Sequence, residues 1–257
     1  MNRRPYPVFI MTYNLVSTTK RMVEDILRMG GQPIIIDNAS TYPPLLDWYD
    51  SLKNNKDVHL VRLPGNFGPH FIYHNLLSIR KTYSGLTGKK LPPEFFITDC
   101  DLDLSEIPDD GIDVLYRIYD ACKSQKRIFL KIGFGLRIDD LPVVPHLLRT
   151  ITWESQFYKS CEKVSGIKVN AEAKIDTTFH LYDSTLLQRA RNFIKRNPVQ
   201  IDFYSPAIRT YAPYVARHIP WYWEKEKLGE EETYYLQHIN PSLPISHSAD
   251  IKRIFNL

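Results

Sequence analysis

The chain contains, at residues 95–103, the stretch Phe-Phe-Ile-Thr-Asp-Cys-Asp-Leu-Asp, in which an apolar, β-favouring run is followed by three alternating acids. The run predicts a buried strand, so the acids at its carboxyl end would share one small volume. Carboxylates that close repel one another unless a cation joins them or their pKa values shift. Oxygen ligands suit Mg²⁺ or Mn²⁺, usually completed by substrate phosphates. The stretch therefore predicts a metal–diphosphate site, with a solvated acidic loop as the alternative.

Strands and helices alternate through the first hundred residues. Strands are expected at 7–11, 33–36, 58–63 and 95–98, with helices between them. The second half is less regular, with helices expected at 113–122, 147–161 and 186–195, strands at 127–134, 176–182 and 207–211, and a loop from 236 onward. Strands joined by helices imply a mainly parallel sheet with right-handed crossovers. We therefore expect an α/β fold in which a mainly parallel, Rossmann-like sheet is flanked by helices, as a single domain over 1–257.

The composition is that of a globular protein, with 43% hydrophobic and 24% charged residues. A formal charge of +4 is too small to argue for nucleic-acid binding, which needs a concentrated basic stripe. Three widely spaced cysteines without a CxxC pair argue against a disulfide framework or zinc site and favour a reducing compartment. No stretch approaches the roughly 18 apolar residues of a membrane span. We expect a cytoplasmic protein with no integral membrane span and no nucleic-acid partner.

Polar groups follow each of the first four expected strands. Because ligands bind at the carboxyl ends of an open parallel sheet, these groups are candidates for a nucleotide site. They supply an aromatic face, a carboxylate for an imide or ribose, an Asn flanked by glycines, and the acids. The candidates are Tyr13, Asn14, Asp37, Asn38, Asn66, Gly68, Asp99 and Asp101. Each type is also common in ordinary turns, but four coincident endings favour the nucleotide site.

In its first hundred residues the chain resembles the GT-A fold of glycosyltransferases, in particular glycosyltransferase family 2 and its relatives. The resemblance rests on the order of Thr-Tyr-Asn at 12–14, Ile-Ile-Ile-Asp-Asn-Ala-Ser-Thr at 34–41, Gly-Asn-Phe-Gly at 65–68 and Asp-Cys-Asp at 99–101. It implies a nucleotide-sugar-binding half at 1–105 and an acceptor-binding half at 106–257. By the same resemblance, Tyr13 and Asp37 would hold the nucleotide base and Asn66 would lie near the donor.

The Asp-Cys-Asp motif corresponds to the metal motif of these enzymes. The resemblance implies that Asp99 lies near the ribose or the metal, that Asp101 binds Mn²⁺ or Mg²⁺, and that His218 is a further metal ligand. A second register, Asp101 with Asp103, is also a D-x-D. We prefer Asp99 with Asp101, because Asp99 directly follows the strand, and we expect Asp103 to be a cap or a solvated acid.

An inverting sugar transfer needs a carboxylate that takes the proton of the acceptor hydroxyl. Asp176, expected to open the strand at 176–182, stands where similar enzymes often have such a base. Glu172 and Glu154 are rivals, and a turn cap is the alternative role for Asp176.

The favoured function is a metal-dependent, inverting glycosyltransferase that moves a sugar from a nucleotide sugar, UDP- or GDP-linked, to a glycan or other hydroxyl acceptor. A sugar-phosphate nucleotidyltransferase is an alternative, but residues 13–19 lack the Gly and Arg of a triphosphate-binding loop. A non-catalytic carbohydrate- or nucleic-acid-binding module is a third possibility, supported by the basic, aromatic-rich stretch 209–223. In that stretch we expect Arg209 on a solvated basic face.

Overall fold

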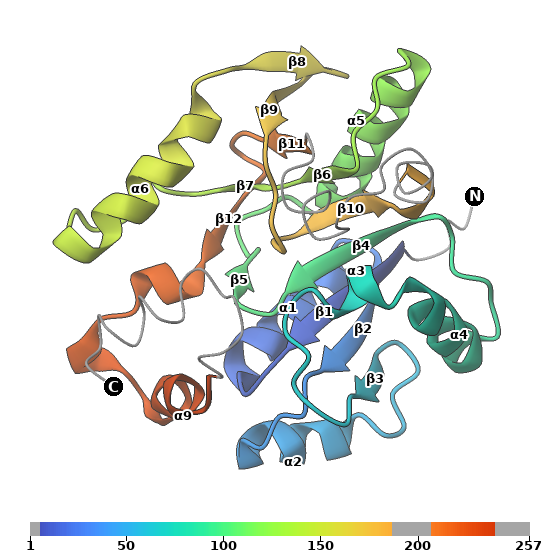
Figure 1. Ribbon diagram of the computed structural model, residues 1–257, viewed down its shortest axis with the longest axis vertical. Helices are drawn as coiled ribbons and strands as arrows, with labels where there is room; N and C mark the ends of the chain where they lie inside the picture. Colours follow the sequence, from blue (N-terminus) through green and yellow to red (C-terminus); the bar gives the residue numbers. More distant parts are fainter. Residues whose placement is uncertain (1–5, 187–206, 240–257) are drawn as a thin grey trace.

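A nine-stranded sheet forms the centre of the protein in the computed structural model, which describes residues 6–186 and 207–239 (Figure 1). The strand order is β3-β2-β1-β4-β10-β6-β11-β9-β8. The strands are β1 (Tyr6–Thr12), β2 (Gly31–Asp37), β3 (His59–Arg62), β4 (Glu94–Asp99), β6 (Lys131–Gly133), β8 (Glu162–Val164), β9 (Ile167–Ala173), β10 (His180–Asp183) and β11 (Ala207–Thr210). Among these, β9 and β10 are antiparallel to both neighbours, so the other strands share one direction. The predicted mainly parallel α/β sheet is confirmed.

Helices cover both faces of this sheet, because successive strand residues point to opposite sides. In β1, Val8 and Ile10 belong to one apolar cluster, and Phe9 and Met11 belong to the other. The first cluster is completed by α1 (Val16–Arg28), α2 (Pro43–Ser51) and α5 (Gly111–Ser124), and the second by α3 (Phe71–His74) and α4 (Leu76–Thr87).

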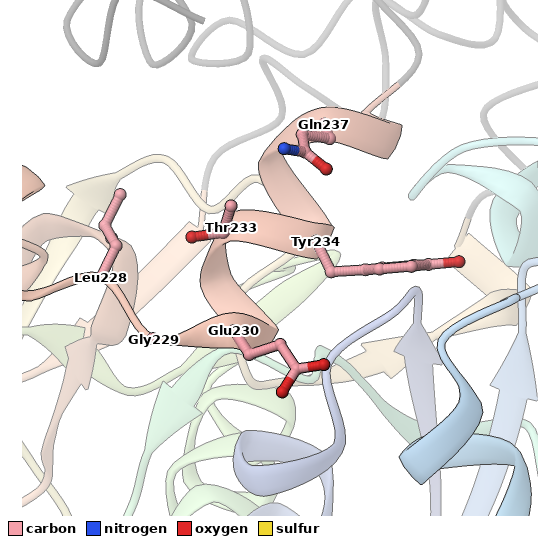
Figure 2. A pocket seen from close by; sticks show the side chains of 6 residues that line it. All are labelled: Leu228, Gly229, Glu230, Thr233, Tyr234 and Gln237. Carbon is pink, nitrogen blue, oxygen red and sulfur yellow. The ribbon is translucent and has the colours of Figure 1, made fainter.

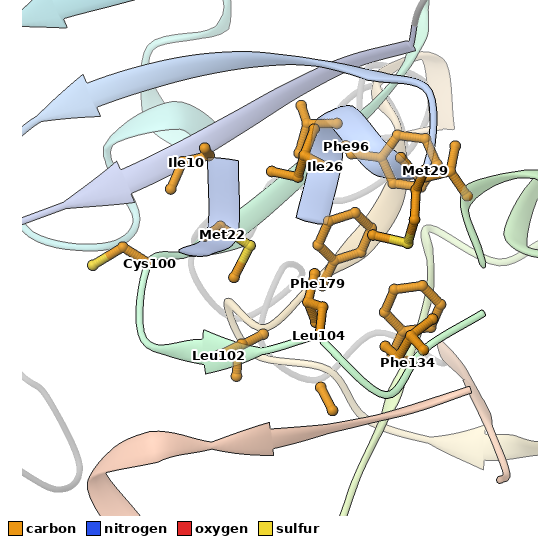
Figure 3. Close-up of a cluster of buried hydrophobic side chains, with 14 of the residues drawn as sticks. Ile10, Met22, Ile26, Met29, Phe96, Cys100, Leu102, Leu104, Phe134 and Phe179 are labelled. Atoms are coloured by element: carbon orange, nitrogen blue, oxygen red, sulfur yellow. The ribbon is translucent and has the colours of Figure 1, made fainter. Parts of the chain in front are cut away.

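Three aromatic rings join the two halves of the chain inside the first cluster (Figure 3). The ring of Phe179 lies 5.4 Å from that of Phe96 on β4 and stacks at 4.9 Å on that of Phe134. Because Phe179 comes directly before β10, the core fixes the end of the loop that joins β9 to β10. That loop carries Asp176.

A small second sheet has the order β5-β12-β7. Its strands are β5 (Leu102–Asp103), β7 (Gly135–Leu136) and β12 (Val215–His218). The remaining elements are α6 (Leu148–Ser155), α9 (Glu230–His238) and the 3-10 helices η1 (Pro145–Leu147), η2 (Gln156–Tyr158), η3 (Ile219–Tyr222) and η4 (Lys225–Lys227). None of the helices in the described ranges is both long enough and apolar enough to cross a bilayer.

Three expectations from the sequence need comment. The strand expected at 176–182 begins only at His180, because residues 174–179 form a loop. The loop expected from Leu236 is wrong as far as His238, since α9 continues to that residue. The helix expected at 186–195 lies, apart from its first residue, outside the described residues.

Gly133 permits the close approach of β6 and β10, and its replacement should destabilise the fold. A methyl group at this position would lie 2.4 Å from the carbonyl oxygen of Phe179 and 2.8 Å from Cβ of His180. We expect Gly133→Ala to lower the free energy of unfolding by about 1–3 kcal/mol, the usual cost of overpacking. Gly85 in α4 is the matched control, because a methyl group there meets no atom within 4 Å. Gly85→Ala should raise stability by about 1 kcal/mol through helix propensity. Equal urea-unfolding midpoints for the two variants would contradict this packing.

Candidate active site

The candidate site lies at the carboxyl ends of β1 and β4. These strands are parallel neighbours, with Met11 opposite Asp99, whereas β2 and β3 extend the sheet on the other side of β1. The amide of Cys100 donates a hydrogen bond to the carbonyl of Met11 at 3.1 Å, which ties the two strand ends together. A reversal of strand order leaves a crevice for a ligand in open α/β sheets. The residues that follow β1 and β4 therefore share one edge, as predicted.

Three carboxylates, from Asp99, Asp101 and Asp176, interact at this edge. The Thr177 hydroxyl donates a hydrogen bond to Oδ2 of Asp99. Burial raises the pKa of Asp99 well above its ordinary value, and the negative charges of Asp101 and Asp176 raise it further. The Thr177 hydrogen bond and the positive charge of Lys131 act in the opposite direction. The edge thus carries negative charge that an added cation would stabilise.

His218 reaches the acids through the second sheet. Strand β12 pairs with β5 so that His218 lies opposite Leu102, and the amide of Ile219 donates to the carbonyl of Asp101 at 2.9 Å. Nε2 of His218 is then 3.5 Å from Oδ2 of Asp101. The structure thus brings together two of the three predicted metal ligands, although they are more than a hundred residues apart in the sequence.

The Asp101–His218 pair has unused ligand atoms. Oδ1 of Asp101 and Nδ1 of His218 are both buried and have no hydrogen-bond partner among the described residues. Within residues 6–186 and 207–239, no three His, Cys, Asp or Glu side chains are grouped closely enough to form a metal site by themselves. A carboxylate and an imidazole fit a divalent ion whose other ligands come from substrate phosphates and water. Asp99 is less available, because Thr177 occupies one of its oxygens.

Asp103 has the role of a cap. Its Oδ1 accepts a hydrogen bond from the amide of Ser105 at 3.0 Å, and its Oδ2 lies 3.6 Å from the guanidinium of Arg21. This arrangement favours the Asp99–Asp101 register over the alternative.

Asp176 lies in the loop between β9 and β10, so the prediction that it opens a strand is wrong. Its side chain is 41% exposed, and its Oδ1 lies 3.9 Å from Nε2 of His70. Burial, followed by the positive charge of Lys131 and the proximity of His74, lowers the pKa of His70 to about 4. His70 is therefore neutral at neutral pH and does not form an ion pair with Asp176.

The rival acids have different surroundings. Glu154 is 5% exposed and accepts a hydrogen bond from the guanidinium of Arg209, which is itself 5% exposed. The expectation of Arg209 on a solvated face is therefore wrong. Glu172 is exposed on β9.

Tyr13 faces helix α9. Its hydroxyl donates to the carbonyl of His238 at 2.9 Å, and its ring packs edge to face on Tyr235 at 6.5 Å. Burial raises the pKa of Tyr13, although hydrogen bonding with Asn66 opposes the shift. Helix α9 thus covers the end of β1, beside the loop that contains Asn66.

The side chain of Asp37 holds neighbouring segments together through hydrogen bonds. It is fully buried and accepts hydrogen bonds from the hydroxyl of Tyr49 at 3.1 Å and from Nε of Arg62 at 3.1 Å. The amide of Ser40 lies 3.3 and 3.2 Å from its two oxygens. Neither carboxylate oxygen is accessible to a nucleotide base. The contact predicted between Asp37 and the nucleotide base stays a prediction, and these hydrogen bonds do not favour it.

Asn14 joins the end of β1 to the start of α2. Its backbone has φ of 51°, a left-handed conformation that Asn tolerates. Its Oδ1 accepts hydrogen bonds from the amides of Thr41 at 2.7 Å and Tyr42 at 3.0 Å. The side chain therefore satisfies amides at the entry to the helix.

Asn38 clamps the loop that follows β3. Its Oδ1 accepts from the amide of Phe67 at 3.2 Å, and its Nδ2 donates to the carbonyl of Gly68 at 3.4 Å. Asn66 accepts from the amide of Gly68 at 3.0 Å, and Gly68 has φ of 80°. The predicted residues of this loop are therefore together, and their mutual contacts shape it.

Sequence reasoning missed Lys131 and Tyr235. Lys131 is 2% exposed, and its position within an apolar strand was a signal, because a lysine is rarely buried without a partner. Burial raises the pKa of Tyr235 well above its usual range, and the negative charges of Asp101 and Asp99 add to the effect. Nothing in the sequence pattern indicated Tyr235, since α9 was not predicted.

A pocket of about 310 Å³ lies on α9 and the loop before it (Figure 2). It is lined by Leu228, Gly229, Glu230, Thr233, Tyr234 and Gln237. The hydroxyl of Tyr234, one of the lining residues, lies 2.9 Å from Oγ1 of Thr41. Because the lining of this pocket includes none of the described acids of the β4 edge, we do not place chemistry there.

No protein-family model matches the chain, and no curated protein matches its sequence. Among solved structures, the chain is similar to the mannosyltransferase PcManGT from Pyrobaculum calidifontis, in complex with GDP-Man and Mn²⁺. The two are 14% identical with a TM-score of 0.47, over 84% of this chain and 57% of that protein. The chain thus spans a little over half of that protein's length. A likeness at this level carries no information on the reaction, so the function is inferred below from the site itself.

Loss of charge at Asp101, an acid of the β4 edge, and at Asp37, a buried hydrogen-bonded acid, should have different effects on stability. Asp101→Asn relieves repulsion with Asp99, so we expect the melting temperature in the absence of divalent ions to hold or to rise. Asp37→Asn places an amide donor against the donors of Tyr49, Arg62 and Ser40. We expect it to lower the free energy of unfolding by about 1–3 kcal/mol, the cost of buried polar groups left unsatisfied. Thermal melts in EDTA measure both, and an equal loss for Asp101→Asn would show that Asp101 is a structural acid.

Proposed function

We propose that the protein is a metal-dependent, inverting glycosyltransferase that uses a nucleotide sugar. The observation that carries the proposal is the Asp101–His218 pair beside Asp99 at the reversal of strand order, because its buried ligand atoms have no partner in the part of the chain that the structure describes. A structural acid cluster would be expected to satisfy these atoms internally. Atoms left open for a cation, next to a crevice, instead suit a diphosphate ligand.

In this proposal, Asp101 and His218 hold the divalent ion, Mn²⁺ or Mg²⁺, and Asp99 lies beside the ribose or the ion. When bound, such an ion neutralises the negative charge that develops on the leaving diphosphate. Thr177 keeps Asp99 in place through its hydroxyl, and the pairing of β12 with β5 keeps His218 against Asp101.

The donor lies along the ends of β1 to β3. Tyr13 offers a ring face for the base, and the loop of Asn66 and Gly68 lies beside it. Asn14, Asp37 and Asn38 act by fixing the loops around the base rather than by an open side-chain contact. The donor-binding half is then 1–105, and the acceptor-binding half is 106–257.

Asp176 is the proposed general base. It takes the proton of the acceptor hydroxyl while that oxygen attacks the anomeric carbon, and the bonding pair of the glycosidic bond leaves with the diphosphate. Its side chain is 41% exposed and its negative charge acts on Asp99, so it lies on the side of the donor site. Glu154 is less suited to this role, because its carboxylate is buried and forms an ion pair with Arg209.

The metal dependence of nucleotide binding tests the proposal. Calorimetry with UDP and with GDP should give clearly tighter binding in Mn²⁺ than in EDTA, since the acids repel a bare diphosphate. Asp101→Asn should remove the difference, and Asp103→Asn, which alters the neighbouring cap, should keep it. The metal-bridge model fails if the wild-type affinity is the same in EDTA and in Mn²⁺.

The role of Asp176 has a separate test. Asp176→Asn should keep nucleotide–metal affinity near that of the wild type, because the side chain serves the acceptor. Turnover should fall by roughly 10²–10⁴-fold, the usual contribution of a positioned general base. Glu172→Gln is the matched control and should retain turnover. Normal turnover in Asp176→Asn with loss in Glu172→Gln would transfer the role to Glu172.

A further inference from the structure

Two buried cations lie beside the loop at residues 174–179. Lys131 on β6 is 2% exposed, and Arg209 on β11 is 5% exposed. Burying a cationic side chain costs free energy unless charged or polar partners compensate it. Arg209 has such a partner in Glu154, with which it forms an ion pair. Lys131 donates to backbone oxygens and lies over an aromatic ring, and its positive charge also acts on the buried carboxylate of Asp99.

The two cations bind three consecutive carbonyl groups. Nε of Arg209 donates to the carbonyl of Lys174 at 2.7 Å. Nζ of Lys131 donates to the carbonyls of Ile175 at 3.1 Å and Asp176 at 2.8 Å. Hydrogen bonds from a charged donor are stronger than those between neutral groups. The carbonyl groups of this loop are therefore held by charged side chains, whereas those of a strand would be held by backbone hydrogen bonds to a neighbouring strand.

The next two carbonyls of the loop also have donors from elsewhere. The carbonyl of Thr177 accepts from the amide of Asp99 at 3.2 Å, and that of Thr178 lies 2.5 Å from Nδ1 of His180. Burial, together with the charge of Lys131, lowers the pKa of His180 well below its ordinary value. A neutral His180 can donate from Nδ1 to Thr178 and accept at its other ring nitrogen.

Tyr73 connects these anchors to each other. Its hydroxyl lies 3.0 Å from Nε2 of His180 and 3.5 Å from the carbonyl oxygen of Asp176. Its ring centroid is 4.7 Å from Nζ of Lys131, a cation–π distance. Tyr73 is 1% exposed, so this network is part of the interior.

The side chain of Asp176 is 41% exposed, and its Oδ1 lies 3.9 Å from Nε2 of His70. Where the carboxylate lies depends on the backbone that carries it, and that backbone belongs to a loop whose carbonyls are held by Lys131. A general base must be kept within hydrogen-bond reach of the proton it removes, and small displacements are costly.

We propose that Lys131 is a positioning residue for Asp176: its ammonium group holds the carbonyls of Ile175 and Asp176 and thereby fixes where the carboxylate lies. This inference rests on the proposed function, in which Asp176 is the base. It assigns a functional reason to a buried lysine that a methionine of similar length could replace if only filling of space were required.

A double-mutant cycle tests the inference. Lys131→Met should lower kcat by about 10–100-fold, part of the contribution of the base, and leave the donor KM within about threefold. In the Asp176→Asn background, the same change should alter the remaining kcat by less than about twofold, because the group that it positions is already absent. Lys168→Met, at an exposed lysine on β9, is the matched control and should leave kcat unchanged. Equal losses in the two backgrounds would overturn the proposal, since they would show that Lys131 does not act through Asp176.

Amide hydrogen exchange of the full-length protein gives a readout that does not depend on transferase activity. In Lys131→Met, the segment 174–179 should exchange at least about tenfold faster, with β1 and β2 unchanged, because a local anchor is lost. Lys168→Met should match the wild type, and unchanged exchange at 174–179 in Lys131→Met would overturn the proposal. If the wild type transfers no sugar from any UDP- or GDP-linked donor, the proposed function fails, and the exchange of this segment still decides whether Lys131 anchors the loop.

A milder variant covers the case in which Lys131→Met does not fold. Tyr73→Phe removes only the hydroxyl that contacts His180 and the carbonyl of Asp176. We expect it to lower kcat by about 3–10-fold in the wild-type background and not in the Asp176→Asn background. The same loss in both backgrounds would count against the network.

Discussion

Repulsion among carboxylates at the carboxyl end of β4 is the constraint on which the rest of the site depends. Asp99 and Asp101 follow one strand, and Asp176 approaches from another part of the chain, so their charges interact in a partly buried place. The protein opposes the repulsion with the Thr177 hydroxyl and the buried charge of Lys131. It leaves one oxygen of Asp101 buried without a partner among the described residues. Under the proposed function, this excess of negative charge and the unpartnered oxygen favour binding of a divalent ion together with a diphosphate.

The elements that complete the site around these carboxylates come from the second half of the chain. Strand β12 brings His218 to Asp101, the loop at 174–179 brings Thr177 to Asp99, and α9 covers Tyr13. Each contact joins residues far apart in the sequence, so each forms only when the chain has closed a long loop, at a cost in conformational entropy. The apolar core supplies the compensation, and Phe179, the last residue of the loop of Asp176, packs there against the rings of Phe96 and Phe134.

Much of the sheet could be predicted because its signals are local. The apolar runs that end at Thr12, Asp37 and Asp99, with helices between the strands, define β1, β2 and β4 from periodicity alone. Parallel strands place their carboxyl ends on one edge, so the meeting of Tyr13 with the residues after β4 followed from topology. The error at Asp176 has an equally local cause. Residues 176–182 have an apolar, β-favouring composition, but the ladder begins at His180 because the preceding carbonyls are held by Lys131, Asp99 and His180 itself.

The sequence by itself determined the α/β class, the edge at which the polar residues gather and the identity of the acids, since these depend on strand period and on chain order. Only the tertiary structure decided which of those residues are engaged elsewhere. Asp37 and Asn14 look like ligand-binding groups in sequence, yet their side-chain oxygens are occupied by Arg62 and by the amides at the start of α2. Lys131 looks like an interruption of a strand, yet it holds the loop of Asp176. Hydrogen-bond satisfaction depends on which distant groups fold against a side chain, and a linear pattern does not contain that information.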